Sequence, residues 1–122
     1  MTKTKVDYLG TQGSPTSLAL STTTTYSTVN CSTFIGLAVQ VYLTQTSATG
    51  AAHLVEVLAS SDGTNFDTEA YCSASVPIAA ATRQLTFAVP YAEDINQIKL
   101  RITNGCTAAA IGVWASLVEV TP

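Results

Sequence analysis

Apolar and polar positions alternate along several short stretches of this chain, with the period of two that predicts β-strands. The clearest case is residues 97–103, where Ile98, Leu100 and Ile102 are apolar and the positions between them are polar. A longer alternating stretch covers residues 34–43. The same reasoning predicts further strands at residues 53–59, 66–71, 85–89 and 111–120. Each strand is expected to turn one face toward a core.

No stretch repeats apolar residues at the spacing of a helix, and residues 91–95 are expected to hold at most a short turn of helix. The predicted strands are separated by turn-forming residues, which cluster at 46–50, 60–65 and 104–105. Several short strands without helices predict a single-domain, all-β protein with an antiparallel β-sandwich or jelly-roll-like fold.

The expected core consists of the positions where the alternation is cleanest. These positions are Ile35, Leu37, Val39, Val41, Leu85, Phe87, Ile98, Leu100 and Ile102.

Residues 1–30 differ from the rest, because they are rich in Thr, Ser and Gly and have few periodic apolar positions. They are predicted to form an N-terminal extended arm or edge segment, and residues 31–122 the β-sandwich domain. Such an arm gains too little from apolar burial to order by itself, and it would add as a strand to a neighbouring subunit. In the alternative, Leu18, Leu20 and Tyr26 complete the chain's own sandwich as its first strand.

Two predicted strands are apolar on both faces, which is unusual for an antiparallel sheet in a small monomer. Phe34 and Tyr42 lie on the second face of the first of them, and Trp114 on that of the last. Either these are central strands covered by the N-terminal segment, or their aromatic residues form contacts between subunits. The candidate interface residues are Phe34, Tyr42, Trp114, Leu18, Leu20 and Tyr26, and we expect a homo-oligomer.

Charge is scarce, since charged residues make up 11% of the 122 residues while hydrophobic residues make up 47%. A surface this poor in charge is expected to be partly covered in an assembly. The net charge of −3 and the scattered basic residues disfavour nucleic acid as a partner. No apolar stretch approaches the ~20 residues of a membrane span, and the start of the chain does not read as a signal peptide. We therefore expect no membrane association and synthesis in the cytosol.

Neither catalysis nor a cofactor is indicated. Cys31, Cys72 and Cys106 are odd in number and widely spaced, which favours buried free thiols, although one late disulfide stays open. The single histidine, His53, stands in no recognisable catalytic frame. Oxygen ligands cluster around residues 62–69, but their spacing does not match a calcium loop. We expect no enzyme, no catalytic residue, no metal site and no cofactor.

The sharpest local motif is the strand and turn at residues 55–66, with the sequence VEVLASSDGTNF. Asp62-Gly63 supplies the positive φ of a tight hairpin, Asn65 tolerates left-handed geometry, and Phe66 is expected to re-enter the core. This motif resembles the strand, S-x-D-G-T-N-[FW], strand signature of β-sandwich modules in virion proteins of tailed phages. The later stretches 98–103 and 112–120 are similar to the last two strands of such modules.

The resemblance implies a non-catalytic capsid decoration or cement protein, which stabilises a phage head by protein–protein contacts. Its partner would be the major capsid protein or another virion protein. It would be made in the host cytoplasm and end in the virion, as a trimer first and a dimer second. The alternative is a carbohydrate- or receptor-binding β-sandwich module of a phage tail, in which exposed aromatic rings stack on sugars.

Overall fold

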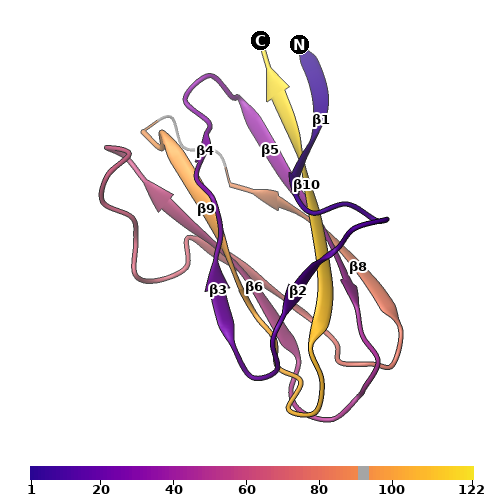
Figure 1. Cartoon of the computed structure of the whole chain (residues 1–122). Helices are drawn as coiled ribbons and strands as arrows, with labels where there is room; N and C mark the ends of the chain where they lie inside the picture. Colours follow the sequence, from indigo (N-terminus) through magenta and orange to yellow (C-terminus); the bar gives the residue numbers. More distant parts are fainter. Residues whose placement is uncertain (91–93) are drawn as a thin grey trace.

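The computed structural model describes residues 1–90 and 94–122, and these residues form two antiparallel sheets packed together (Figure 1). The strands are β1 (Thr2–Leu9), β2 (Thr16–Leu18), β3 (Thr23–Thr25), β4 (Val29–Asn30), β5 (Gly36–Thr44), β6 (His53–Ser60), β7 (Cys72–Val76), β8 (Thr82–Val89), β9 (Gln97–Thr103) and β10 (Ile111–Thr121). The described residues contain no helix, and the predicted single-domain β-sandwich is confirmed. The turn of helix considered for residues 91–95 falls on residues 91–93, which lie outside the described ranges.

Sheet I has the strand order β1-β10-β5-β8, with β2 pairing along the same edge of β10 as β1. Sheet II has the order β3-β9-β6-β7, with β4 also paired to β9. The longest strand, β10, is central in sheet I and lies between β1 and β5 (Figure 1). Because side chains alternate between the two faces of a strand, each sheet has one inner and one outer face.

The core lies between the sheets and consists of β-branched and leucine side chains from the inner faces. Five of the expected core residues are fully buried: Val39, Val41, Ile98, Leu100 and Ile102. Three others, Leu37, Leu85 and Phe87, are partly buried and pack against them. Burying a side chain of this size contributes about 1.5–3 kcal/mol, so these alternating positions supply much of the drive to fold.

Ile35 is the one expected core residue that the structure contradicts, because its side chain is 43% exposed. It precedes β5, and its amide donates to the carbonyl of Val120 near the end of β10. At this end of the sandwich β10 and β1 continue to the chain termini (Figure 1). The alternation with a period of two does continue along β5. It does not show where along the strand the opposing sheet ends.

Residues 1–30 form β1 to β4 and lie at the edges of both sheets of their own chain. β1 and β2 pair with β10, while β3 and β4 pair with β9. Residues 2–7 of β1 are exposed, so main-chain hydrogen bonds hold this strand rather than apolar burial. Leu18 at the end of β2 is 3% exposed and belongs to the core.

The strand predicted at residues 66–71 is wrong, since the chain returns to β6 only at Cys72. Residues 61–71 form a long turn, in which Gly63 has the expected positive φ of 77°. The Asp62 carboxylate accepts from the amides of Thr64 and Asn65, each at 2.8 Å. The Phe66 side chain does not re-enter the core. Its ring lies outside the core, with the Lys99 ammonium group 4.1 Å from the ring centroid.

Asn104 ends β9 and fixes the adjacent loops. Its side chain is 1% exposed. The amide nitrogen donates to the carbonyls of Leu18, Ala19 and Ala109 at 3.1–3.2 Å. The amide oxygen accepts from the backbone N–H of Cys106 at 2.9 Å. Since buried polar groups must find partners, this one side chain links residues 18–19 to the loop that follows β9.

Candidate functional site

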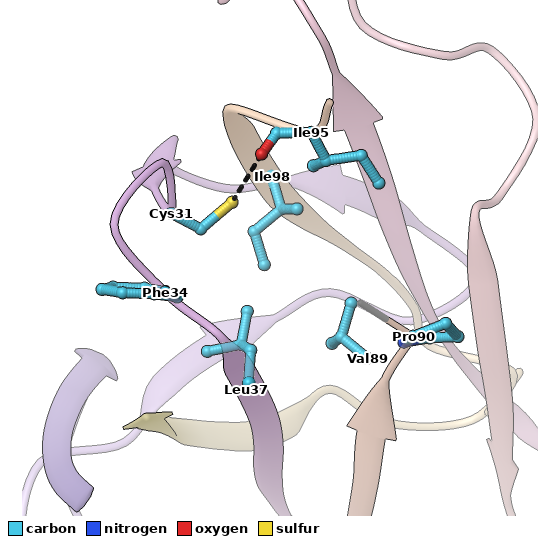
Figure 2. Close-up of a pocket in the computed structure, with 8 residues that line it drawn as sticks. Cys31, Phe34, Leu37, Val89, Pro90, Ile95 and Ile98 are labelled. Atoms are coloured by element: carbon cyan, nitrogen blue, oxygen red, sulfur yellow. Dashed lines mark hydrogen bonds between the residues drawn. The ribbon is translucent and has the colours of Figure 1, made fainter. Parts of the chain in front are cut away.

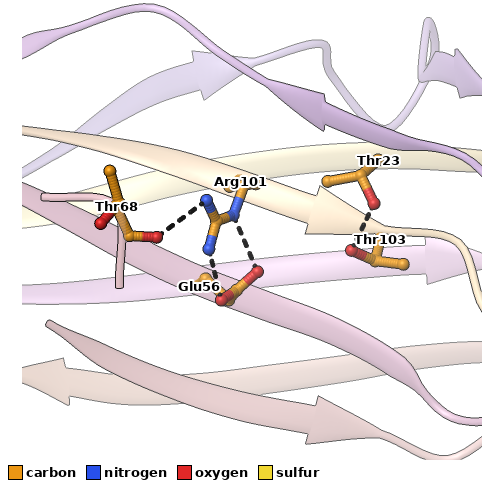
Figure 3. Close-up of polar contacts among 5 residues, drawn as sticks. All are labelled: Thr23, Glu56, Thr68, Arg101 and Thr103. Atoms are coloured by element: carbon orange, nitrogen blue, oxygen red, sulfur yellow. Dashed lines mark hydrogen bonds and ion pairs between the residues drawn. The ribbon is translucent and has the colours of Figure 1, made fainter. Parts of the chain in front are cut away.

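The outer faces of the two sheets differ in charge. On sheet II, Arg101 donates to both carboxylate oxygens of Glu56 at 2.8 and 2.9 Å, and also to the carbonyl of Thr68 at 3.4 Å (Figure 3). This pairing lowers the pKa of the Glu56 carboxyl group. Thr23 and Thr103 share a hydrogen bond of 2.8 Å on neighbouring strands. On this face the charges of Glu56 and Arg101 are therefore paired within the chain, and the Lys99 ammonium group lies over the Phe66 ring.

The outer face of sheet I has almost no charge. The residues that alternate with the buried ones on β5, β8 and β10 carry only aliphatic, aromatic, hydroxyl or amide side chains, or none. They are Gly36, Ala38, Gln40, Tyr42, Thr44, Thr82, Gln84, Thr86, Ala88, Gly112, Trp114, Ser116, Val118 and Val120. We call this set the uncharged face. Charged side chains border it on β1, where Lys3 pairs with Val120, Lys5 with Val118 and Asp7 with Ser116.

An aromatic pair stands on the uncharged face. Tyr42 and Trp114 are directly opposite each other in the register of β5 and β10. Their rings are stacked with centroids 4.9 Å apart and planes 6° apart. Both side chains are half-buried, so each ring also keeps some exposed surface. Cross-strand aromatic pairs stabilise a sheet, and here the pair also projects toward solvent.

A hollow of about 520 Å³ lies beside this pair, and we call it the aromatic hollow. It is lined by Lys5, Asp7, Thr11, Gln12, Tyr42, Thr82, Gln84, Trp114, Ala115 and Ser116. Its volume falls within the roughly 300–1,000 Å³ of small-molecule sites. The lining combines two aromatic rings with carboxylate, ammonium, amide and hydroxyl groups. This combination suits a ligand with both apolar faces and hydroxyl groups.

A second pocket lies at the end of the sandwich near the termini, between the two sheets (Figure 2). Cys31, Phe34, Leu37 and Ile98 are among its lining residues, and the Cys31 thiol donates to the carbonyl of Ile95 at 3.9 Å. It holds only about 30 Å³, little more than a water molecule needs. Burial raises the pKa of the Cys31 thiol, which disfavours its reactive thiolate form. The pocket is therefore a packing gap with an apolar rim.

Exposed apolar side chains gather around this end. Ile35 is 43% exposed and Val6 38% exposed, while Met1 projects beyond β1. Met1 precedes the pair of Thr2 and Thr121, Ile35 donates its amide to Val120, and Val6 pairs with Leu117 further along β10. Together with the half-buried Phe34 they form what we call the terminal patch. Exposed apolar side chains gathered at one end of a domain make this end a candidate contact site.

The six candidate interface residues are dispersed. Tyr42 and Trp114 form the stacked pair, Phe34 belongs to the terminal patch, and Leu18 is buried in the core. Leu20 is 46% exposed at the opposite end of the sandwich, and Tyr26 is half-buried against the core. Leu18 therefore offers no surface to a partner, whereas Tyr42, Trp114, Phe34 and Leu20 do.

The sequence pattern did not point to three polar residues that line the aromatic hollow, Asp7, Gln12 and Gln84. They come from β1, from the loop after it and from β8. Only the order of strands in sheet I brings them to one place, so no local sequence signal could have found them.

His53 is sealed in the interior and is fully buried at the start of β6. Its Nδ1 accepts from the backbone N–H of Gly105 at 3.1 Å, so Nε2 carries the proton and donates to Gln45 Oε1 at 2.8 Å. The same Gln45 oxygen accepts from the Ala79 amide at 2.9 Å. This neutral ring joins three loops, and burial lowers its pKa below the ordinary value. The geometry is structural.

We expect stability to fall as the pH drops below about 6.5, the ordinary pKa of histidine. Below that value the unfolded chain binds a proton that the folded chain, with its lowered pKa, does not. A second proton on the buried ring would place an Nδ1–H against the Gly105 N–H, so the folded chain resists protonation. The loss of stability therefore grows as the pH falls from the unfolded pKa to the lower folded pKa of His53. Urea unfolding between about pH 7 and pH 5 measures this dependence. Since His53 is the only histidine, His53→Gln should abolish the change of unfolding free energy with pH in this range. If that change persists in the variant, it does not come from His53.

Among residues 1–90 and 94–122, no three His, Cys, Asp or Glu side chains gather as metal ligands would. Near residues 62–69, the Asp62 carboxylate is occupied by hydrogen bonds from Ser60, Thr64 and Asn65. These bonds hold the pKa of Asp62 far below its usual range. Over the two described ranges, 1–90 and 94–122, no helix has the length and apolar character needed to cross a membrane.

The fold and the uncharged face define a β-sandwich protein with a surface suited to contacts. No family model matches the chain, and no curated protein matches it. Among solved structures, it is similar to a chain of infectious bursal disease virus Gx strain, with a TM-score of 0.61 and 16% identity over 98% of this chain. A chain of the Gt strain gives a TM-score of 0.54 and 14% identity over 98% of this chain. A chain from Bacillus endospore appendages, described as disulfide-linked pili, gives 0.48 and 16% over 98% of this chain and 87% of its own.

This chain spans about a third of the length of the two viral chains, 32% and 33%. At these identities the likeness establishes a shared β-sandwich fold. A β-sandwich of this kind therefore also occurs in chains of solved virus structures.

Proposed function

We propose that this chain is a non-catalytic virion structural protein of the capsid decoration or cement type, made in the host cytoplasm and located in the virion. It attaches to the major capsid protein or another virion protein. The terminal patch carries the proposal, because Val6 and Ile35 are exposed at one end of the sandwich. The viral chains of the same fold and the scarcity of charge support a role in assembly.

Self-association belongs to the same proposal, with a trimer first and a dimer second. The exposed strand β1 lies at the edge of sheet I, and among the described residues it pairs only with β10. A free strand edge presents unpaired backbone groups to a second copy. Sedimentation equilibrium of the purified chain tests this, and a monomer both free and on the particle would contradict it.

The terminal patch is tested by Ile35→Asp. This variant should bind particles of the encoding virus about tenfold more weakly, since a charge at an apolar contact costs at least 1.4 kcal/mol. Its own stability should change by less than about 0.5 kcal/mol because the side chain is exposed. Cosedimentation of labelled protein with particles that lack the chain gives the affinity.

Leu20→Asp is the matched control, with an aliphatic side chain of similar exposure, 46% against 43%. Leu20 lies near Ile111, the residue opposite Leu18, about 30 Å along β10 from the partner of Ile35. It should bind like the unmodified chain. Equal losses in both variants would remove the terminal patch from the contact, and absence of the chain from purified virions would overturn the virion role.

A second candidate function is a carbohydrate- or receptor-binding module of a phage tail. The aromatic hollow favours this second function, because it combines two stacked rings with polar side chains. The terminal patch does not have this combination. The two functions use different surfaces and can be tested separately.

A further inference from the structure

We propose that the aromatic hollow beside Tyr42 and Trp114 is a binding site for a neutral saccharide. The site deepens the second of the two functions above and does not require the terminal patch. Its failure would therefore leave the virion role standing.

The stacked pair provides the apolar part of the site. Each ring covers one face of the other at a centroid distance of 4.9 Å, and both rings also line the hollow. Neither side chain is needed to close the core, because both stand on the outer face between the buried positions. The C–H face of a sugar ring matches such a surface, whose amphipathic rings contact both apolar and wet groups.

Polar side chains surround the rings on two sides. Asp7 offers acceptor oxygens from β1, while Gln84 offers both a donor and an acceptor from the exposed side of β8. Gln12 adds further groups of the same kind, whereas Ser116 is 4% exposed and its hydroxyl donates to Gln40 Oε1 at 3.4 Å. Sugar hydroxyls both donate and accept, so this mixed set fits them better than it fits an apolar ligand.

Charge selects a neutral ligand. The uncharged face holds no ionised group, and the two charged residues that line the hollow, Lys5 and Asp7, have opposite signs. An anionic sugar would meet Asp7, and a cationic one Lys5. A site for either would need an excess of one sign.

A fixed hairpin forms one wall. Thr11 and Ser14 exchange two backbone hydrogen bonds of 3.1 Å, which hold Thr11 and Gln12 beside the hollow. Gly10 enters this hairpin at a φ of 55°, with Ser14 and Thr16 atoms 3.1 Å from where a Cβ would lie. Both the conformation and the space therefore favour glycine at this position. The wall is preformed, which lowers the entropy cost of binding.

Trp114 is the only tryptophan, so its fluorescence reports on the hollow directly. The experiment titrates the full chain with neutral trisaccharides of glucose, galactose, mannose and N-acetylglucosamine, up to about 20 mM, the range of weak single-site affinities. We expect a saturable change in emission with at least one of them. No saturable change with any trisaccharide overturns the proposal, and saturation by a proline-rich peptide alone would make the hollow a peptide site instead.

Variants locate the binding. Tyr42→Ala should weaken it about tenfold or more, and Gln84→Ala, whose exposed side chain is not needed for folding, about threefold. Phe66→Ala removes a half-buried aromatic ring from the outer side of sheet II and should leave the affinity unchanged. Binding that survives both Tyr42→Ala and Gln84→Ala, or that falls equally in Phe66→Ala, places the ligand elsewhere and overturns the site.

Discussion

Replacing Asn104 by aspartate is expected to destabilise the fold by about 3–5 kcal/mol, although the two side chains have the same shape. The amide nitrogen donates to three backbone carbonyls, and a carboxylate would set an oxygen against all of them. Because the side chain at position 104 is only 1% exposed, water could not solvate the new charge. Urea unfolding at neutral pH measures the loss, which would be a large part of the stability of a domain this size.

The pH dependence separates this mechanism from a loss of packing. Burial would raise the folded pKa of an aspartate at position 104 above its unfolded value. The deficit is therefore largest above that folded pKa, and it shrinks as the pH falls toward about 4, where the carboxyl group is protonated. Asn30→Asp is the control. The Asn30 side chain is exposed, and its Oδ1 accepts from the amide and hydroxyl of Ser32, which an aspartate oxygen can also do. A loss below about 1 kcal/mol for Asn104→Asp would contradict the network.

Leu100→Ala is expected to cost about 2–5 kcal/mol, the range for large-to-small changes in a packed core. Leu100 is 1% exposed in the middle of β9 and is paired with Val57 of β6. Its neighbours are held by sheet hydrogen bonds on both sides, so the cavity cannot collapse easily.

Leu20→Ala is the matched control for this core substitution. Leu20 is 46% exposed, and its truncation should change stability by less than about 0.5 kcal/mol. Chemical denaturation of both variants under the same conditions gives the comparison. A cost below about 1 kcal/mol for Leu100→Ala would mean that the core is not built around β9 as described.

The candidate site was predicted only in part. The apolar second faces of two strands drew attention to Tyr42 and Trp114, which do stand on an outer face. That these two residues stack depends on the register between β5 and β10, and a shift by one residue would put them on opposite faces. The polar side chains of the hollow come from β1, β8 and the loop at residues 10–14. No local pattern links such distant segments.

The sequence by itself determined the fold class and most of the core, because alternation with a period of two is a local property that survives in any sheet arrangement. It identified Leu100 and Val41 as buried, and it identified the turn at Asp62. The tertiary structure decided where each strand leaves the core, so Ile35 is exposed and Phe66 packs on Lys99 outside. It also decided the order of strands. Pairings between residues far apart in the chain follow from the packing of the whole sandwich, and no short stretch encodes them.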